Sequence, residues 1–164
     1  MRVREATKED FDQVARLTVA AYRALKTWVG DEYAVHLTDV EARANAENTT
    51  VLVAEDDRIL GSVTLTIGGG PYFEWDPDLH GDCGFRMLAV DPEAQGRGVG
   101  PRLVAECLER ARSAGCRRMV IGSTEWMTTA HRIYRRLGFR RVPEYDQQWG
   151  DIRGLCFVLD LRDA

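Results

Sequence analysis

Apolar residues recur at every third or fourth position in some stretches of the chain and form short β-branched runs in others. The first pattern predicts helices with one buried face, and the second predicts strands. Thr7, with Asp10 three residues later, gives a capping-box-like start to the first helix. The apolar face of that helix consists of Phe11, Val14, Leu17, Ala21 and Leu25.

The remaining patterns alternate between strands and helices along the chain. They predict a strand at 3–6, a helix at about 32–46, hairpin strands at 50–55 and 59–67, a strand at 83–90, a helix at 101–114, a strand at 117–122, a helix at 128–137, and strands at 139–142 and 152–161. This order mixes hairpins with strand-helix-strand units. We therefore predict an α+β fold of the three-layer α/β/α type, with a mixed, mostly antiparallel sheet covered by helices on both faces.

Length and composition favour one ordinary globular domain spanning residues 1–164. Hydrophobic residues make up 45% of the 164 positions and charged residues 29%. No apolar run approaches the roughly 18 residues of a membrane span, and the N-terminus lacks an apolar signal segment. These features predict a cytoplasmic protein with no membrane partner.

The net charge and the spacing of cysteines and histidines argue against several classes of partner and site. The formal net charge of −4 argues against a nucleic-acid partner, whose binding surface is normally basic. The four cysteines have no C-x-x-C spacing, which predicts buried free thiols. The three histidines share no i, i+4 helix face, so no metal site is predicted.

The glycine-rich turn at 95–102 predicts an anion site. It follows an apolar strand and opens an amphipathic helix, whose first amides have no partners within the helix and carry partial positive charge. The residues of this site are Gln95, Gly96, Arg97, Gly98, Val99, Gly100, Pro101 and Arg102. The third glycine of a dinucleotide fingerprint and the lysine of a Walker A loop are both missing. An ordinary strand-turn-helix corner is the alternative.

Two segments together resemble the GNAT superfamily of acetyl-CoA-dependent N-acetyltransferases. The first is Gln95-x-x-Gly98-x-Gly100 directly after a strand, and the second is Ala130-x-x-x-Tyr134-x-x-x-Gly138-Phe139. The predicted order of elements fits that fold along nearly the whole chain, whereas the specific motifs lie only between residues 88 and 139. The resemblance implies a central parallel strand pair that splays at the cofactor site.

The resemblance also implies roles for individual residues. The turn would bind the pyrophosphate of acetyl-CoA, whose arm would lie along Leu88, Ala89 and Val90. The amide of Val90 or Leu88 would polarise the thioester carbonyl, and the Tyr134 phenol would stabilise or protonate the leaving thiolate. Periodicity alone would make Tyr134 a half-buried aromatic side chain. Met127 stands where many members have an asparagine that contacts the cofactor arm.

The sequence specifies the binding site of the amine acceptor less closely than that of acetyl-CoA. The loop at 68–82 is acidic and aromatic, which suits a cationic acceptor, although a solvated surface loop has the same composition. The candidate residues are Trp28, Tyr33, Tyr72, Glu74, Trp75 and Asp82. No general base is assigned, and His131 is interpreted as a surface or supporting residue beside Tyr134.

The sequence thus predicts acetyl transfer from acetyl-CoA to a primary amine by direct attack in a ternary complex, without a metal. The acceptor is a small metabolite or the amine of a peptide or protein. A non-catalytic acyl-CoA-binding regulatory module and a catalyst that uses a longer acyl donor are the alternatives. The sequence leaves a homodimer open.

Overall fold

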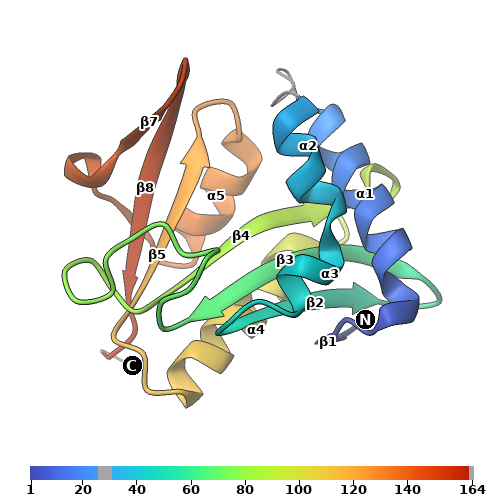
Figure 1. The fold of residues 1–164 in the computed structure, drawn as a ribbon, viewed down its shortest axis with the longest axis horizontal. Coiled ribbons are helices and arrows are strands. Elements are labelled where there is room, and N and C mark those ends of the chain that lie inside the picture. The colour runs from blue at the N-terminus through green and yellow to red at the C-terminus, as the bar shows by residue number, and fades with distance from the viewer. Residues whose placement is uncertain (26–30, 163–164) are drawn as a thin grey trace.

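A single mixed sheet organises the molecule, which is described by a computed structural model for residues 1–25 and 31–162. In that part of the chain the sheet has eight strands (Figure 1). The strands are β1 (Arg2–Glu5), β2 (Thr49–Glu55), β3 (Ile59–Ile67), β4 (Cys83–Val90), β5 (Arg118–Thr124), β6 (Arg140–Arg141), β7 (Gln147–Trp149) and β8 (Ile152–Asp160). The helices are α1 (Phe11–Arg23), α2 (Asp31–Thr38), α3 (Val40–Ala44), α4 (Val99–Ser113) and α5 (Thr128–Arg136).

The strand order is β1-β2-β3-β4-β5-β8-β6, and β7 pairs with β8. Among the described strands, β4 and β5 form the one parallel pair, and the other pairs are antiparallel. The predicted fold class is therefore confirmed. Within the described residues, no helix is long and apolar enough to cross a membrane.

The structure corrects some predicted element boundaries. The single helix predicted at 32–46 is two helices, because Asp39 interrupts it and caps α3 by accepting the Ala42 amide at 3.1 Å. Helix α4 begins at Val99, two residues before the predicted start. Strand β7 was not predicted, since its three residues are too few to show a period.

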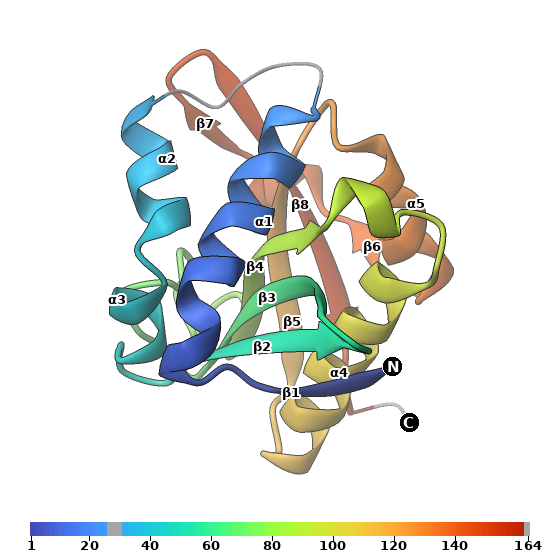
Figure 2. The ribbon, with the colours of Figure 1, turned by 90° about the vertical axis from the view of Figure 1, so that its right-hand side faces the viewer.

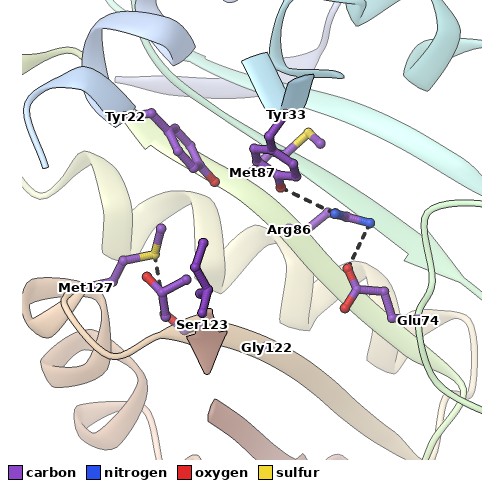
Figure 3. A pocket seen from close by; sticks show the side chains of 10 residues that line it. Tyr22, Tyr33, Glu74, Arg86, Met87, Gly122, Ser123 and Met127 are labelled. Carbon is purple, nitrogen blue, oxygen red and sulfur yellow. Dashed lines mark hydrogen bonds and ion pairs between the residues drawn. The ribbon is translucent and has the colours of Figure 1, made fainter. Parts of the chain in front are cut away.

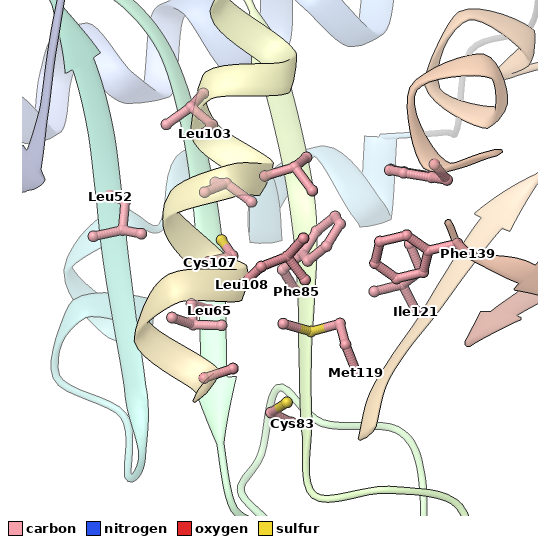
Figure 4. Packing of buried hydrophobic residues seen from close by; sticks show 14 of the residues in the cluster. Leu52, Leu65, Cys83, Phe85, Leu103, Cys107, Leu108, Met119, Ile121 and Phe139 are labelled. Atoms are coloured by element: carbon pink, nitrogen blue, oxygen red, sulfur yellow. The ribbon is translucent and has the colours of Figure 1, made fainter. Parts of the chain in front are cut away.

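Successive side chains of β2 point alternately into two core layers, one on each face of the sheet. Leu52 and Ala54 belong to the cluster that contains α4, whereas Val51 and Val53 pack with residues of α1. Figure 2 shows α1, α2 and α3 on one side of the sheet and α4 and α5 on the other. Figure 4 shows the α4 layer. The four cysteines are buried and free, as predicted.

Strand β4 contains a β-bulge in its second half. Thr64 of β3 lies opposite Arg86, and Ser62 lies opposite Ala89, so two residues of β4 face one residue of β3. Met87 adopts a left-handed conformation with φ of 54°. Its side chain therefore packs beside α1 and α2, on the same face as Arg86. A bulge reverses the alternation of side chains beyond it, which is the effect seen here.

The bulge coincides with the separation of β4 from β5. These parallel strands are paired at one position, Cys83 with Met119, and Figure 1 shows them running apart beyond it. The splayed parallel pair implied by the resemblance is thus present. It exposes the edge of each strand that faces the other.

A charged cluster ties β1 to the start of α1. The Asp10 carboxylate accepts the Thr7 amide at 2.7 Å and the Arg4 guanidinium at 2.7 Å. The Arg4 hydrogen bond lowers the pKa of Asp10 to about 2. Asp10 thus closes the predicted capping box and fixes the entry into α1.

We predict that Asp10→Asn destabilises the fold at pH 7 by about 1–2 kcal/mol, because the ion pair is lost. The pKa of Asp10 is lower in the folded state, so its ionisation stabilises the fold above about pH 4 and ceases to do so as the pH falls towards about 2. Urea unfolding at several pH values checks this. A difference between wild type and variant that stays constant down to pH 2 would contradict it.

Candidate functional site

The turn between β4 and α4 presents backbone amides without a side-chain cap. Gly96 and Gly98 both have φ of +79°, and Gly98 is the N-cap residue of α4. A Cβ at either glycine would meet nothing within 4 Å. The positive φ, and not crowding, therefore favours glycine at both positions. No side chain of the described residues caps this helix start, so its amides can receive an anion.

The side chains of this turn have other partners. Arg97 Nη2 lies 3.1 Å from Asp56 Oδ2, and Arg102 is exposed with Glu106 at 3.8 Å. Gln95 Nε2 donates to the Val90 carbonyl at 3.4 Å. The uncapped backbone amides are therefore the groups best placed to receive an anion, and Arg97 and Arg102 lie at the surface near them.

Close packing of α4 on α5 holds the turn in place. A Cβ at Gly100 would approach Ile133 Cδ1 to 3.1 Å, and Val99 is buried beside it. Pro101 occupies the exposed side of the first turn of α4. Glycine at position 100 thus lets the two helices approach each other directly below the anion site.

Backbone groups of β4 face the gap between β4 and β5. The Asp91 amide donates to the Leu60 carbonyl of β3 at 2.8 Å. Amides alternate between the two edges of a strand, so those of Val90 and Leu88 point towards β5. Because β5 pairs with β4 at Cys83 alone, these amides are available to a ligand in the gap. Ala89 directs its backbone to β3, and its side chain packs with the α1 layer.

Tyr134 of α5 lies in an aromatic environment. Its ring centroid is 5.7 Å from Phe85, 5.7 Å from Phe139 and 5.5 Å from Phe157. Burial raises the pKa of Tyr134 above its usual value, and the neighbouring Cys107 thiol adds to the effect. The phenol is therefore neutral near pH 7, and it can donate a hydrogen bond more readily than it can release a proton.

A pocket of about 390 Å³ opens between β4 and β5 on the side of α1 and α2 (Figure 3). Its walls come from the helices α1 and α2, the loop before β4, strand β4 at its bulge, the end of β5 with the turn after it, and the start of β8. The lining includes the side chains of Tyr22, Tyr33, Glu74, Arg86, Met87 and Met127. The volume suits a small molecule.

Two side chains of the pocket lining form an ion pair. Arg86 Nη1 lies 3.0 Å from Glu74 Oε1, and Arg86 Nη2 donates to the Tyr33 hydroxyl at 3.3 Å. Burial alone would lower the pKa of Arg86, but the neighbouring Tyr33 and Glu74 outweigh it and raise that pKa. The arginine is thus firmly charged, and the Glu74 carboxylate is already compensated.

A hydroxyl and an imidazole meet at the end of β5. Ser123 Oγ lies 3.1 Å from His131 Nε2, and both side chains are buried. Burial lowers the pKa of His131, while a hydrogen bond to the Thr124 backbone acts in the opposite direction. A backbone carbonyl acceptor favours the tautomer in which the other ring nitrogen carries the proton and Nε2 accepts from Ser123.

Ser123 connects the two faces of the sheet. Met119 and Ile121 of β5 point into the α4 layer, and Ser123 follows them towards α5. It still lines the pocket on the other face, because β4 does not cover this end of β5. The serine hydroxyl thus lies between the pocket and the α5 side.

Comparison with known proteins agrees with this geometry. The Acetyltransferase (GNAT) family matches residues 11–139. The chain belongs to the GNAT family of acetyltransferases. A GNAT acetyltransferase from Brucella melitensis, solved in complex with acetyl-CoA, is 27% identical with a TM-score of 0.60, over 97% of this chain and 89% of that one.

Two curated relatives are each 31% identical to this GNAT chain. An uncharacterized protein of Mycobacterium leprae matches over 83% of this chain and 33% of its own length. An uncharacterized N-acetyltransferase of Schizosaccharomyces pombe matches over 58% of this chain and 54% of its own length. The match therefore spans a third to about half of these relatives.

The acceptor residues expected in this GNAT chain are dispersed. Tyr33 and Glu74 line the pocket, while Tyr72 and Trp75 line a smaller neighbouring hollow. Asp82 lies at the base of β4, where it accepts the Arg117 amide at 2.8 Å. Trp28 lies outside the described residues.

Other residues of the site were not expected. Arg86 and Tyr22 line the pocket, but their segments gave only strand and helix patterns. His131, for which a surface or a supporting role was expected, is buried and bonded to Ser123, so it is not a surface residue. Met127, at the position of the family's asparagine, offers only its sulfur, which lies 3.5 Å from Ser123 Oγ.

We predict that Gly98→Ala weakens coenzyme A binding about 5- to 10-fold, because a left-handed alanine costs roughly 1 kcal/mol and the loop shifts to relieve it. Gly115→Ala is a matched control. Gly115 has the same φ of +79° and equally open surroundings, but it lies at the far end of α4. Calorimetric titration checks both variants, and equal affinities for coenzyme A would contradict the assignment of the turn.

Proposed function

We propose that this chain transfers an acetyl group from acetyl-CoA to the primary amine of a small acceptor by direct attack. The observation that carries the proposal is the open edge of β4, which joins the anion-binding turn to the pocket. Membership of the GNAT family supports the same donor. A strand edge with unpaired backbone groups is suited to an extended, amide-bearing arm.

The turn before α4 and the open edge of β4 offer groups that match the chemical groups of acetyl-CoA. Pyrophosphate suits the uncapped amides between Gly96 and Gly100. The surface is open there, because a Cβ at Gly96 or Gly98 would meet nothing within 4 Å. Arg97 and Arg102 add positive charge near this surface. The pantetheine amides suit the backbone of Leu88 and Val90 along the gap.

Bond formation would take place where the gap meets the pocket. The acceptor nitrogen forms a bond with the thioester carbonyl carbon, the C–S bond breaks, and coenzyme A leaves as a thiolate. The amide of Val90 or Leu88 would hold the charge that develops on the carbonyl oxygen. A fixed amide at an unpaired strand edge needs no reorganisation to do this.

Ser123 and His131 supply a route for the amine proton. As the N–C bond forms, the nitrogen would give a proton to Ser123 Oγ, and the serine would pass its own proton to His131 Nε2, 3.1 Å away. The imidazole is neutral near pH 7, because burial lowers its pKa. The position of Ser123 at the junction of pocket and gap supports this role.

Tyr134 would stabilise the leaving thiolate by donating a hydrogen bond. The raised pKa of its phenol makes complete proton transfer to a thiolate unfavourable. Solvent would therefore protonate the thiol after release. The aromatic rings around Tyr134 hold the phenol in one orientation and exclude water.

Incubation with acetyl-CoA and a panel of amines, with detection of free thiol, tests the proposal. Acceptor-dependent release of coenzyme A is the expected result. Tight coenzyme A binding without thiol release for any amine would contradict it and would favour a non-catalytic binding module.

We predict that Tyr134→Phe lowers kcat about 10-fold or more and leaves the affinity for coenzyme A nearly unchanged, because only the hydroxyl is removed. Steady-state kinetics and calorimetry measure the two effects. The ring remains in its aromatic environment, so thermal unfolding should change little. An unchanged kcat would remove Tyr134 from the mechanism.

We predict that Ser123→Ala lowers kcat about 10-fold with little change in the affinity for acetyl-CoA, and that Ser123→Thr, which keeps the hydroxyl, restores most of the rate. Ser62→Ala is the control. Its hydroxyl is also buried within the sheet, but it has no hydrogen-bond partner and lies outside the pocket. Wild-type turnover in Ser123→Ala would overturn the proton route.

A further inference from the structure

Two arginines and one glutamate lie in or directly behind the wall of the pocket, so positive charge is in excess in this region. Arg86 and Glu74 form an ion pair in it, and the side chain of Arg86 is 24% exposed. Arg43 of α3 lies close by and is completely buried. It donates to Thr64 Oγ1 at 2.6 Å and to the Leu37 carbonyl at 3.0 Å. Thr64 lies directly opposite Arg86 on β3, so the two guanidinium groups are close.

No carboxylate of the described side chains forms an ion pair with Arg43. Its neighbours Tyr22, Tyr33 and Tyr72 offer phenols and no carboxylate, and its Nε has no hydrogen-bond partner among the described residues. Burial lowers the pKa of Arg43, and the charge of Arg86 lowers it further. Two guanidinium groups therefore accompany one carboxylate in and behind the pocket wall, and a buried excess charge is costly unless a ligand balances it.

We propose that the acceptor carries a carboxylate beside its amine and that Arg86 binds this carboxylate. The inference rests on the acetyl transfer proposed above and specifies its substrate class. The sequence suggested a cationic acceptor from the acidic loop, but Arg86 compensates Glu74, and the remaining charge is positive.

The two charges of the pocket match a zwitterion. Arg86 and Glu74 lie 3.0 Å apart, which suits the neighbouring carboxylate and ammonium groups of an α-amino acid.

Apolar side chains define the rest of the acceptor. Met87, Met127 and Ile152 line the pocket together with the ring of Tyr22 (Figure 3). Methionine side chains adapt to irregular apolar ligands. An α-amino acid with an apolar side chain therefore fits both the charge and the lining.

Matched acceptor pairs test the inference directly. Leucine, methionine and phenylalanine are each compared with their amides, which keep the amine and side chain but lack the carboxylate. We expect kcat/KM for the acids to exceed that for the amides by about 10- to 100-fold, the usual effect of a hydrogen-bonded charge pair. A peptide N-terminus also lacks this carboxylate, so it should resemble the amides.

Arg86→Gln should reduce this ratio to near unity, and Arg86→Lys should retain part of it. Arg110→Gln is the matched control, because Arg110 is also a partly exposed, ion-paired arginine but lies on the α4 side of the sheet. The ratio is measured within each variant, so a general loss of folded protein does not affect it.

The outcomes separate the two proposals. Transfer to acids and amides at equal rates in wild type would overturn the carboxylate site and leave acetyl transfer standing. If no amine is acetylated, calorimetric titration of the protein-coenzyme A complex with the same pairs decides the site. Binding of the acids that depends on Arg86 would support it, and equal or absent binding of acids and amides would overturn it.

Discussion

The separation of two parallel strands determines how this molecule is arranged. Strands β4 and β5 lie at the centre of the sheet, yet they are paired at one position. Burying unpaired backbone groups is unfavourable, so such a gap persists only where water or a ligand reaches it. The gap places the uncapped turn before α4, the amides of Val90 and Leu88, and the pocket along one continuous edge.

The bulge at Met87 and Leu88 shapes the β4 wall of the pocket. Without it, strict alternation would place Met87 on the α4 face of the sheet. A left-handed methionine costs of order 1 kcal/mol, which the burial of its side chain beside α1 and α2 offsets. The same bulge leaves Arg86 and Met87 on one face, so a cation and an apolar wall come from adjacent residues.

The sequence predicts the structure best where a local motif specifies the backbone geometry. Glycines with positive φ are recognisable at Gly96 and Gly98, and the strand-helix order follows from periodicity. The pocket was harder to predict, since its residues come from α1, α2, β4, β5, β8 and two connecting segments. The sequence pattern places Arg86 in an ordinary strand, and only the bulge in the structure shows why it lines the pocket. Nothing in the sequence signals that Arg43 is completely buried.

The Ser123–His131 contact illustrates the same limit. The two residues are eight positions apart, Ser123 in β5 and His131 in α5, on either side of the turn that joins these elements. The hydroxyl reaches the pocket only because β4 leaves the end of β5 uncovered. Pairing of this kind depends on the tertiary structure, and neither residue type nor spacing signals it in the sequence.

The central claim is that the gap between β4 and β5 holds the acyl donor. A crystal structure of the protein with acetyl-CoA tests it most directly. The account predicts the pyrophosphate on the amides between Gly96 and Gly100, the arm along the β4 edge, and the thioester oxygen at the amide of Val90 or Leu88. Closed, fully paired β4 and β5 strands with the donor bound elsewhere would contradict it.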